Sequence, residues 1–218
     1  MSNITASAST SAGIIAARLR DDINDGRWPD GAALRQDELA TLYGVSRIPV
    51  REALNLLRDD GLVVIEPNRG AYVTRLRVAD VEEIFDLRIL LEADALVRAI
   101  PAHSRKTLVL IEAIQAQLEL EDAKAAWIQS DRAFHEALYA PSGRPQTLAL
   151  ISKLRTRVER YGLSKLRPGS RREGWASEHR QLLAAVTAGD AEEAVKVLTM
   201  HLQETCSAVC AALTLTQT

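Results

Sequence analysis

Apolar residues recur every three or four positions in three segments near the N-terminus, which is the spacing of helices with one buried face. We expect helices over residues 14–23, 34–43 and 46–59. In the second helix Leu39 and Leu42 are predicted to face inward. The apolar stripe of the third consists of Val50, Ala53, Leu54 and Leu57. Turn residues at 24–31 and at 60–61 separate these segments from their neighbours.

Two short runs rich in β-branched or aromatic residues follow, at 62–65 and 71–74. The turn residues 66–70 lie between them, so the pair is predicted to form a β-hairpin. Two helices, a turn, a third helix and a hairpin make up a winged helix-turn-helix, which we assign to residues 12–77. Arg69 at the hairpin tip, beside Gly70, suits a contact with a DNA groove or a phosphate.

The third predicted helix has a second stripe that suits DNA. Gly44 supplies the backbone freedom of a tight turn, and Ser46 is predicted to cap the helix through its hydroxyl. Pro49 lies in the first turn, where a missing N–H does little harm. The polar stripe consists of Arg47, Arg51, Asn55 and Arg58. A helix that packs by one face and presents guanidinium groups on another is suited to the major groove.

Beyond residue 78 the pattern is helical throughout. Helices are predicted over residues 81–100, 105–120, 123–139, 147–166, 172–188 and 191–213, with Pro- or Gly-containing breaks between several of them. We therefore expect a second domain over residues 78–215 that is an all-α helical bundle. The Ser/Thr-rich residues 1–11 are predicted to be a disordered tail. The predicted fold class is mainly α.

Composition limits how this chain could bind nucleic acid. Its 218 residues carry a formal net charge of −2, which excludes a wholly basic coat and requires a local patch. The sequence contains neither a membrane-length apolar run nor a secretory signal, so a bacterial cytoplasmic protein is expected. Cys206 and Cys210 are interpreted as reduced, apolar helix residues, because they lack the C-x-x-C spacing of redox or metal motifs.

Three histidines and one aspartate occupy apolar helix faces in the second domain. Asp131 and His135 are spaced i, i+4 on one such face, while His179 and His201 lie in the apolar stripes of two other helices. A buried carboxylate without a partner costs several kcal/mol, and a divalent metal removes that cost. The set suits zinc or another borderline transition ion. The alternative is a group of hydrogen-bonded core residues, in which the Asp–His pair satisfies itself.

Arg88 also lies in an apolar stripe, in the helix predicted over residues 81–100. Glu92 follows one turn later, so a simple Arg88–Glu92 ion pair is one interpretation. The other is that Arg88 binds the carboxylate of a small ligand held beside the metal.

Both halves of the chain resemble one family. Residues 37–40 (Asp-Glu-Leu-Ala), 44–54 (Gly-Val-Ser-Arg-Ile-Pro-Val-Arg-Glu-Ala-Leu), 60–63 and 69–73 resemble the winged helix of GntR-type bacterial transcription regulators. The later segments Asp131-Arg-Ala-Phe-His135, Glu178-His179 and His201-Leu202 resemble the metal-binding FCD domain of the FadR-type subfamily, in its six-helix, VanR-like form.

The resemblance implies roles for matching residues. Ser46, Arg47 and Arg51 would contact operator DNA, with Gly70 in the wing. A divalent ion, with zinc ahead of nickel or manganese, would be bound by Asp131, His135, His179 and His201. Such regulators are homodimers that bind near-palindromic double-stranded operators, and small carboxylates or sugar acids modulate them.

Three positions depart from the family pattern. Ile48, on the DNA-binding helix, stands where threonine is common, which removes a hydroxyl contact. Asp37 stands where some relatives have a basic residue, and Arg144 where asparagine often follows Ser-Gly. None of these departures affects the four predicted metal ligands.

The leading hypothesis is therefore a metabolite-responsive transcriptional regulator, by default a repressor that a carboxylate effector releases from DNA. A metal-dependent enzyme acting on a small acid is the first alternative. The sequence offers no evident general base for such an enzyme. Glu136 and Glu178 are next to metal ligands in the sequence but are expected to point to other faces of their helices. A regulator whose metal is purely structural is the second.

Overall fold

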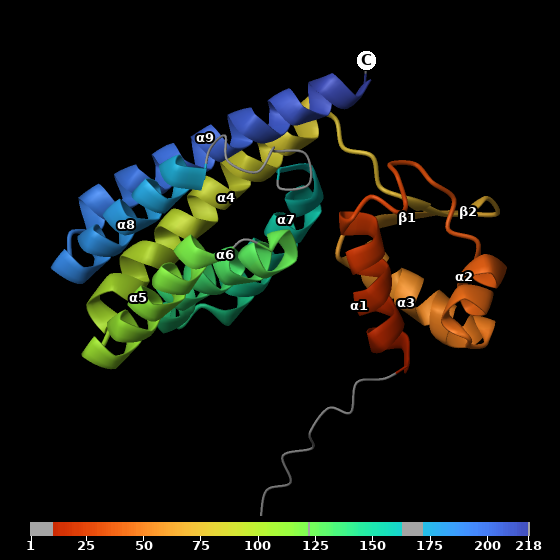
Figure 1. Ribbon diagram of the computed structural model, residues 1–218, viewed down its shortest axis with the longest axis horizontal. Helices are drawn as coiled ribbons and strands as arrows, with labels where there is room; N and C mark the ends of the chain where they lie inside the picture. Colours follow the sequence, from red (N-terminus) through yellow and green to blue (C-terminus); the bar gives the residue numbers. More distant parts are fainter. Residues whose placement is uncertain (1–10, 122, 163–171, 218) are drawn as a thin grey trace, which may run out of the picture. The chain divides into compact units, whose positions relative to one another are not determined.

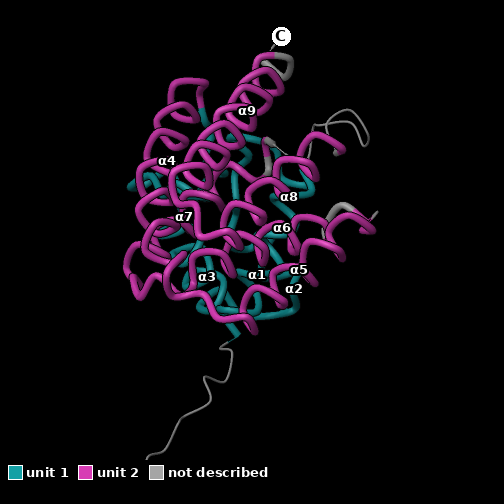
Figure 2. The backbone as a smooth tube through the Cα atoms, turned by 90° about the vertical axis from the view of Figure 1, so that its left-hand side faces the viewer, with its two compact units in different colours: residues 1–76 teal, residues 77–218 magenta. Residues whose placement is uncertain are grey.

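A computed structural model of the chain describes residues 11–121, 123–162 and 172–217. The chain forms two compact units, one ending at Leu76 and the other beginning at Arg77 (Figure 2). Ser11 begins the first helix, and the rest of the expected N-terminal tail lies outside the described residues.

The first unit contains three helices followed by a two-stranded antiparallel hairpin (Figure 1). They are α1 (Ser11–Asn24), α2 (Gln36–Tyr43), α3 (Arg47–Asp59), β1 (Val63–Glu66) and β2 (Gly70–Val73). Val63 pairs with Val73 and Glu66 with Gly70, while Ala33 forms an isolated bridge to Tyr72. The predicted winged helix-turn-helix is confirmed, with each strand shifted by one residue.

The apolar stripe predicted for α3 lies in the core of this unit, where Val50, Ala53, Leu54 and Leu57 are buried against α1. The prediction for α2 was wrong at Leu42, which is 42% exposed. The buried positions of this short helix are Leu39 and Ala40. At 100° per residue, Leu42 lies roughly a third of a turn away from their midpoint, toward solvent.

The turn before α3 differs from expectation in one respect. Gly44 ends α2 with a left-handed φ of 66°, as its predicted role requires. Ser46 occupies the N-cap position of α3, but its side chain makes no capping hydrogen bond. The predicted hydroxyl cap is therefore wrong, and the exposed hydroxyl is left facing solvent.

Six α-helices form the described part of the second unit, which confirms the predicted all-α bundle. They are α4 (Val78–Ala99), α5 (Arg105–Leu120), α6 (Lys124–Tyr139), α7 (Pro145–Gly162), α8 (Arg172–Ala188) and α9 (Ala191–Gln217), with short 3-10 turns η1 (Ile100–Ala102) and η2 (Ala140–Ser142). α4 lies along α9, which also packs against α7 and α8 (Figure 1).

The bounds predicted for α5 and α8 match the structure residue for residue. The predicted end of α7 near residue 166 and the break at residues 168–169 lie outside the described residues. No described helix is long and apolar enough to cross a membrane.

Candidate metal centre and DNA-binding surface

Three histidines from three helices meet inside the second unit. His135 lies on α6, His179 on α8 and His201 on α9, and all three are buried. Their ring centroids are 4.8 to 5.3 Å apart. One nitrogen from each ring lies within 4.8 Å of the others. The structure thus brings together the imidazoles that the sequence pattern directed inward.

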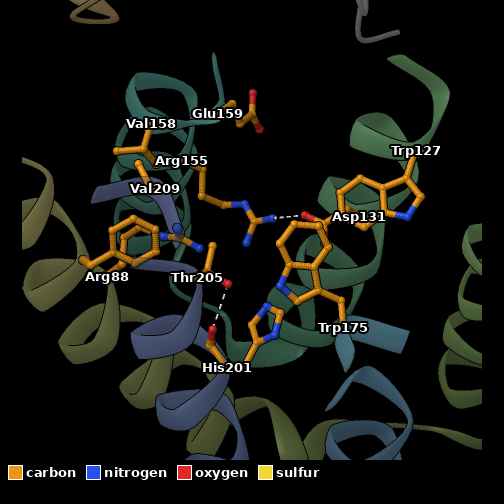
Figure 3. Close-up of a pocket in the computed structure, with 11 residues that line it drawn as sticks. Arg88, Trp127, Asp131, Arg155, Val158, Glu159, Trp175, His201, Thr205 and Val209 are labelled. Atoms are coloured by element: carbon orange, nitrogen blue, oxygen red, sulfur yellow. Dashed lines mark hydrogen bonds and ion pairs between the residues drawn. The ribbon is translucent and has the colours of Figure 1, made fainter. Parts of the chain in front are cut away.

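Asp131 lies at the edge of this cluster. Its Oδ1 is 3.8 Å from His135 Nε2 and 3.6 Å from His179 Nε2. Its Oδ2 accepts a 2.6 Å hydrogen bond from Arg155 Nη2 (Figure 3). Burial raises the pKa of the Asp131 carboxyl, and the Arg155 guanidinium opposes that rise. One carboxylate oxygen is therefore held by Arg155 while the other lies toward the histidines.

A buried hydroxyl determines which nitrogen of His135 holds the proton. Tyr139 donates its hydroxyl proton to Glu92 Oε2 over 2.7 Å, and its oxygen lies 3.1 Å from His135 Nδ1. Because that one proton is committed to Glu92, the oxygen accepts from Nδ1–H. Burial keeps the pKa of His135 well below its usual range, so the ring is neutral and Nε2 has a lone pair. This Nε2 is buried and has no hydrogen-bond partner among the described residues.

His201 is oriented in the same way by a different residue. Its Nδ1 lies 2.7 Å from Glu178 Oε2, so the carboxylate accepts from Nδ1–H. Nε2 is left without a part in this hydrogen bond. The expectation that Glu178 points away from the ligands was wrong, because its long side chain reaches across to the neighbouring helix α9. Glu136 is exposed, as predicted.

Neither ring nitrogen of His179 forms a hydrogen bond within the described structure, although both are buried. Burial lowers its pKa well below the usual range, so it too is neutral. An unsatisfied buried polar atom costs about 1–3 kcal/mol. Lone pairs on the imidazole rings together with one carboxylate oxygen form a donor set that fits zinc or a similar divalent ion. The residues present therefore fit a metal ion.

Arg88 forms the ion pair that the sequence left open. Its Nε donates to Glu92 Oε1 over 2.7 Å, and both side chains are buried. Burial by itself would raise the pKa of Glu92. The guanidinium groups of Arg88 and Arg155 and the Tyr139 hydroxyl outweigh burial, so that pKa lies below its usual value. Arg88 also lines the cavity beside the histidines.

Arg155 is a site residue that sequence reasoning missed. It is buried on α7, and besides its bond to Asp131 its Nη1 lies 3.8 Å from Glu92 Oε2. A signal was present in the sequence, since Arg155 lies in line with Ile151 and Val158, which are both buried. A charged residue within an apolar stripe is the same feature that identified Arg88.

The predicted DNA-binding residues of α3 are all at the surface. Ser46, Arg47, Ile48 and Arg51 are exposed, and Ile48 retains 62% of its accessible surface. Arg47 forms an ion pair with Asp37 of α2. Arg51 has no hydrogen bond or ion pair within the described part of the chain.

The tip of the wing is exposed as well. Arg69 pairs with Glu66 over 3.1 Å, and its carbonyl accepts from the Tyr72 hydroxyl over 2.8 Å. Gly70 has a φ of 113°, a conformation that a side chain would strain. The hairpin therefore presents a guanidinium beside a position that favours glycine.

Two family models match the chain, and together they span both units. Residues 12–73 match "Bacterial regulatory proteins, gntR family", and residues 83–204 match "FCD domain". The first implies DNA binding and the second implies binding of a small-molecule effector.

Similar proteins are regulators. The chain is 31% identical over 201 residues to the uncharacterized HTH-type transcriptional regulator BphR of Paraburkholderia xenovorans, covering 88% of this chain and 82% of that protein. It is 27% identical to the HTH-type transcriptional repressor RspR of Escherichia coli, covering 85% and 83%. The structure of E. coli McbR/YncC is similar with a TM-score of 0.78 at 25% identity, covering 92% of this chain and 97% of that one.

These matches decide against the enzyme alternative, because they are to transcriptional regulators and not to enzymes. The chain belongs to the GntR family of bacterial transcription regulators, in the FadR-type group whose second domain is an FCD domain.

Proposed function

We propose that the protein is a metal-binding, metabolite-responsive repressor that acts as a homodimer in the bacterial cytoplasm. Ser46 at the N-cap of α3, together with Arg47, Ile48 and Arg51 of that helix, contacts the bases and phosphates of a near-palindromic operator. Arg69 and Gly70 of the wing contact the DNA backbone. A two-fold symmetric protein matches a two-fold symmetric site, whose half-site spacing is geometrically strict. RspR is named a repressor, which supports repression as the direction of regulation.

In the second unit, Asp131, His135, His179 and His201 bind a divalent ion, with zinc ahead of nickel or manganese. The observation that carries this proposal is the convergence of three buried, neighbouring imidazoles. His135 Nε2 and both nitrogens of His179 are buried without hydrogen bonds among the described residues. A structure that leaves such atoms unsatisfied is destabilised unless something occupies the space between them.

The effector is a small carboxylate or sugar acid that binds beside the metal, with Arg88 as a charged partner. When bound, the ion supplies a Lewis-acidic position for an effector oxygen. The chain itself supplies two buried guanidinium groups in the cavity lining, those of Arg88 and Arg155, whose N–H groups are suited to an effector carboxylate. Asp131 and Glu159 of the same lining carry the opposite charge. Effector binding lowers operator affinity because it favours a conformation in which the two DNA-binding helices no longer match the half-sites.

Replacing His135 with alanine tests this proposal. We expect the variant to lose its bound zinc and its effector response, while operator binding in the absence of effector is retained. Metal content is measured by atomic emission and operator binding by fluorescence anisotropy. His103→Ala is the matched control, because this fourth histidine lies outside the cluster and bonds to Thr107 and the Leu138 carbonyl. One zinc per chain persisting in the His135 variant would defeat the proposed site.

A further inference from the structure

Two cysteines on α9 take no part in the sites described above. Cys206 and Cys210 are four positions apart, so their side chains leave the same face of the helix with Cβ atoms about 5–6 Å apart. Both are half-buried, and neither forms a disulfide. Glu82 and Asp86 of α4, which lies along α9 (Figure 1), act on the Cys206 thiol through their charges. The chain thus holds two thiols whose spacing is fixed by a helix.

The two thiols are hydrogen-bonded to each other. The Cys206 thiol donates to the sulfur of Cys210, so the two sulfur atoms are already neighbours. Since both side chains are partly exposed, a small ligand reaches them from solvent. One ligand atom can therefore bind both sulfurs without a change in the backbone of α9.

Oxidation is not the chemistry that this pair suits. A disulfide needs Cβ atoms about 3.5–4.5 Å apart, which is closer than the i, i+4 spacing allows without bending the helix. Burial and the neighbouring thiol of Cys210 raise the pKa of the Cys206 thiol to about 12. The thiolate, which is the form that oxidants attack, is therefore scarce at neutral pH. This leaves the binding of a soft ligand atom by both sulfurs.

The number of ligands at this pair excludes zinc. A zinc ion is almost always bound by four ligands. Within the described parts of the chain, the histidine cluster is the group of three or more metal-ligating side chains that lie close enough together to hold an ion. Cys206 and Cys210 thus have no third ligand in reach among those residues. What they can bind is a soft centre that two thiols satisfy.

We propose that Cys206 and Cys210 bind a trivalent arsenical that carries one organic group. Arsenic(III) is soft and pyramidal, and one organic substituent leaves two adjacent positions, which two neighbouring sulfurs match. With an arsenical written R–As=O, two As–S bonds form, the As=O bond breaks, and both thiol protons leave with the oxygen as water. Arsenic stays trivalent, so no oxidant or reductant is needed. This site is separate from the histidine cluster and does not rest on the proposed function.

The test uses phenylarsine oxide on the zinc-loaded full chain. Titrations read by intact-protein mass spectrometry give the number of adducts and their affinity. We expect one adduct per chain and an unchanged zinc content. Cys206→Ser and Cys210→Ser should each weaken binding by at least about 100-fold, because only the paired thiols form the second As–S bond within one molecule.

A relocated thiol tests whether the helical spacing matters. Cys210→Ser/Ala211→Cys keeps two cysteines per chain but places them five positions apart, about 140° around the helix. Ala211 is exposed, so the new thiol is reachable and the core is left intact. The folded variant should bind the arsenical as weakly as the single serine variants. In urea it should regain tight binding, because the helix no longer holds the thiols apart.

The outcomes decide the proposal without reference to zinc. Tight binding by the folded relocated variant, or by either serine variant, would overturn the paired site. The absence of an adduct on the unaltered chain would overturn it as well. If circular dichroism shows that a serine variant is unfolded, the alanine replacement at the same position takes its place. Zinc at the histidines is measured separately, so each of these results leaves the proposed function as it stands.

Discussion

One hydroxyl group sets the chemistry of the candidate metal centre at the scale of single residues. Tyr139 lies between a buried carboxylate, Glu92, and a buried imidazole, His135. Glu92 draws the hydroxyl proton, so the Tyr139 oxygen accepts from Nδ1–H and leaves Nε2 of His135 as the acceptor. In the proposed metal site, Tyr139 would thus act through His135, as a positioning residue.

Replacing Tyr139 with phenylalanine should therefore weaken zinc binding while the helical unit stays folded. Without the hydroxyl, His135 Nδ1–H loses its acceptor and the ring is less firmly oriented. Loss of such a partner typically costs about 10- to 100-fold in metal affinity. Competition with a zinc-binding dye measures the change. Tyr72→Phe, which removes a hydroxyl in the wing, should have no effect, and unchanged zinc affinity in Tyr139→Phe would rule out the positioning role.

Helical spacing predicted that Asp131, His135, His179 and His201 face the core, because each lies within the apolar stripe of a helix. It could not predict which residues form hydrogen bonds with them. Glu92 and Tyr139 meet across 47 positions of sequence, and only the packing of α4 against α6 brings them together. Glu178 reaches His201 because its side chain is long and flexible, which a helix-face argument does not represent.

At the scale of elements, the DNA-binding surface depends on how α2 meets α3. Asp37 on α2 pairs with Arg47 at the start of α3, and both side chains are mostly exposed. Under the proposed function, Arg47 must leave this carboxylate to contact an operator phosphate or base. Asp37 therefore competes with DNA, and its own charge also repels the phosphates.

Asp37→Asn should consequently tighten operator binding. An exposed ion pair contributes about 0–1 kcal/mol, so we expect a gain of up to about five-fold at low salt. Anisotropy titrations at several salt concentrations would measure the affinity and its salt dependence. Glu38→Gln is the matched control, since it removes a neighbouring charge that pairs with Arg35 instead. Equal gains in both variants would show a general charge effect and not competition for Arg47.

The start of α4 shows how a polar contact extends a helix beyond its apolar pattern. The apolar pattern predicts a start at residue 81, but α4 begins at Val78. Asp80 accepts from the backbone N–H of Arg77 over 2.8 Å and from its guanidinium. These contacts form the first turn before the buried stripe begins.

Asp80→Asn should lower the free energy of unfolding by about 0.5–1 kcal/mol at pH 7. The hydrogen bonds from Arg77 lower the pKa of Asp80 to about 2, from an ordinary value of 3.8. A carboxyl whose pKa is lower in the folded state stabilises it fully above about pH 4, and this contribution disappears as the pH falls toward 2. Urea unfolding should therefore show a smaller gap between the two proteins at pH 3 than at pH 7. A constant gap would exclude the ionised carboxylate as its cause.

At the scale of the whole molecule, the chain forms two compact units, so we expect a bound metal to stabilise only the unit that holds it. Within the described residues, the cluster of side chains able to hold a metal ion lies in the second unit. An ion that binds the folded unit but not the unfolded chain stabilises it by about 2.7 kcal/mol when its free concentration is 100 times Kd. For a unit of this size, each kcal/mol raises the unfolding temperature by roughly 2–4 °C.

Scanning calorimetry of chelator-treated protein, before and after zinc is added, should therefore show one transition that moves upward and one that does not. Binding of zinc by Cys206 and Cys210 in the unfolded chain would reduce the shift, so Cys206→Ser/Cys210→Ser should enlarge it. His135→Ala should abolish the zinc-induced shift, because one of the converging imidazoles is gone. The transition that moves in the unaltered protein but not in this variant is then that of the unit that binds zinc. If zinc moved both transitions equally, or still moved one in His135→Ala, the histidine cluster would not be where the ion acts.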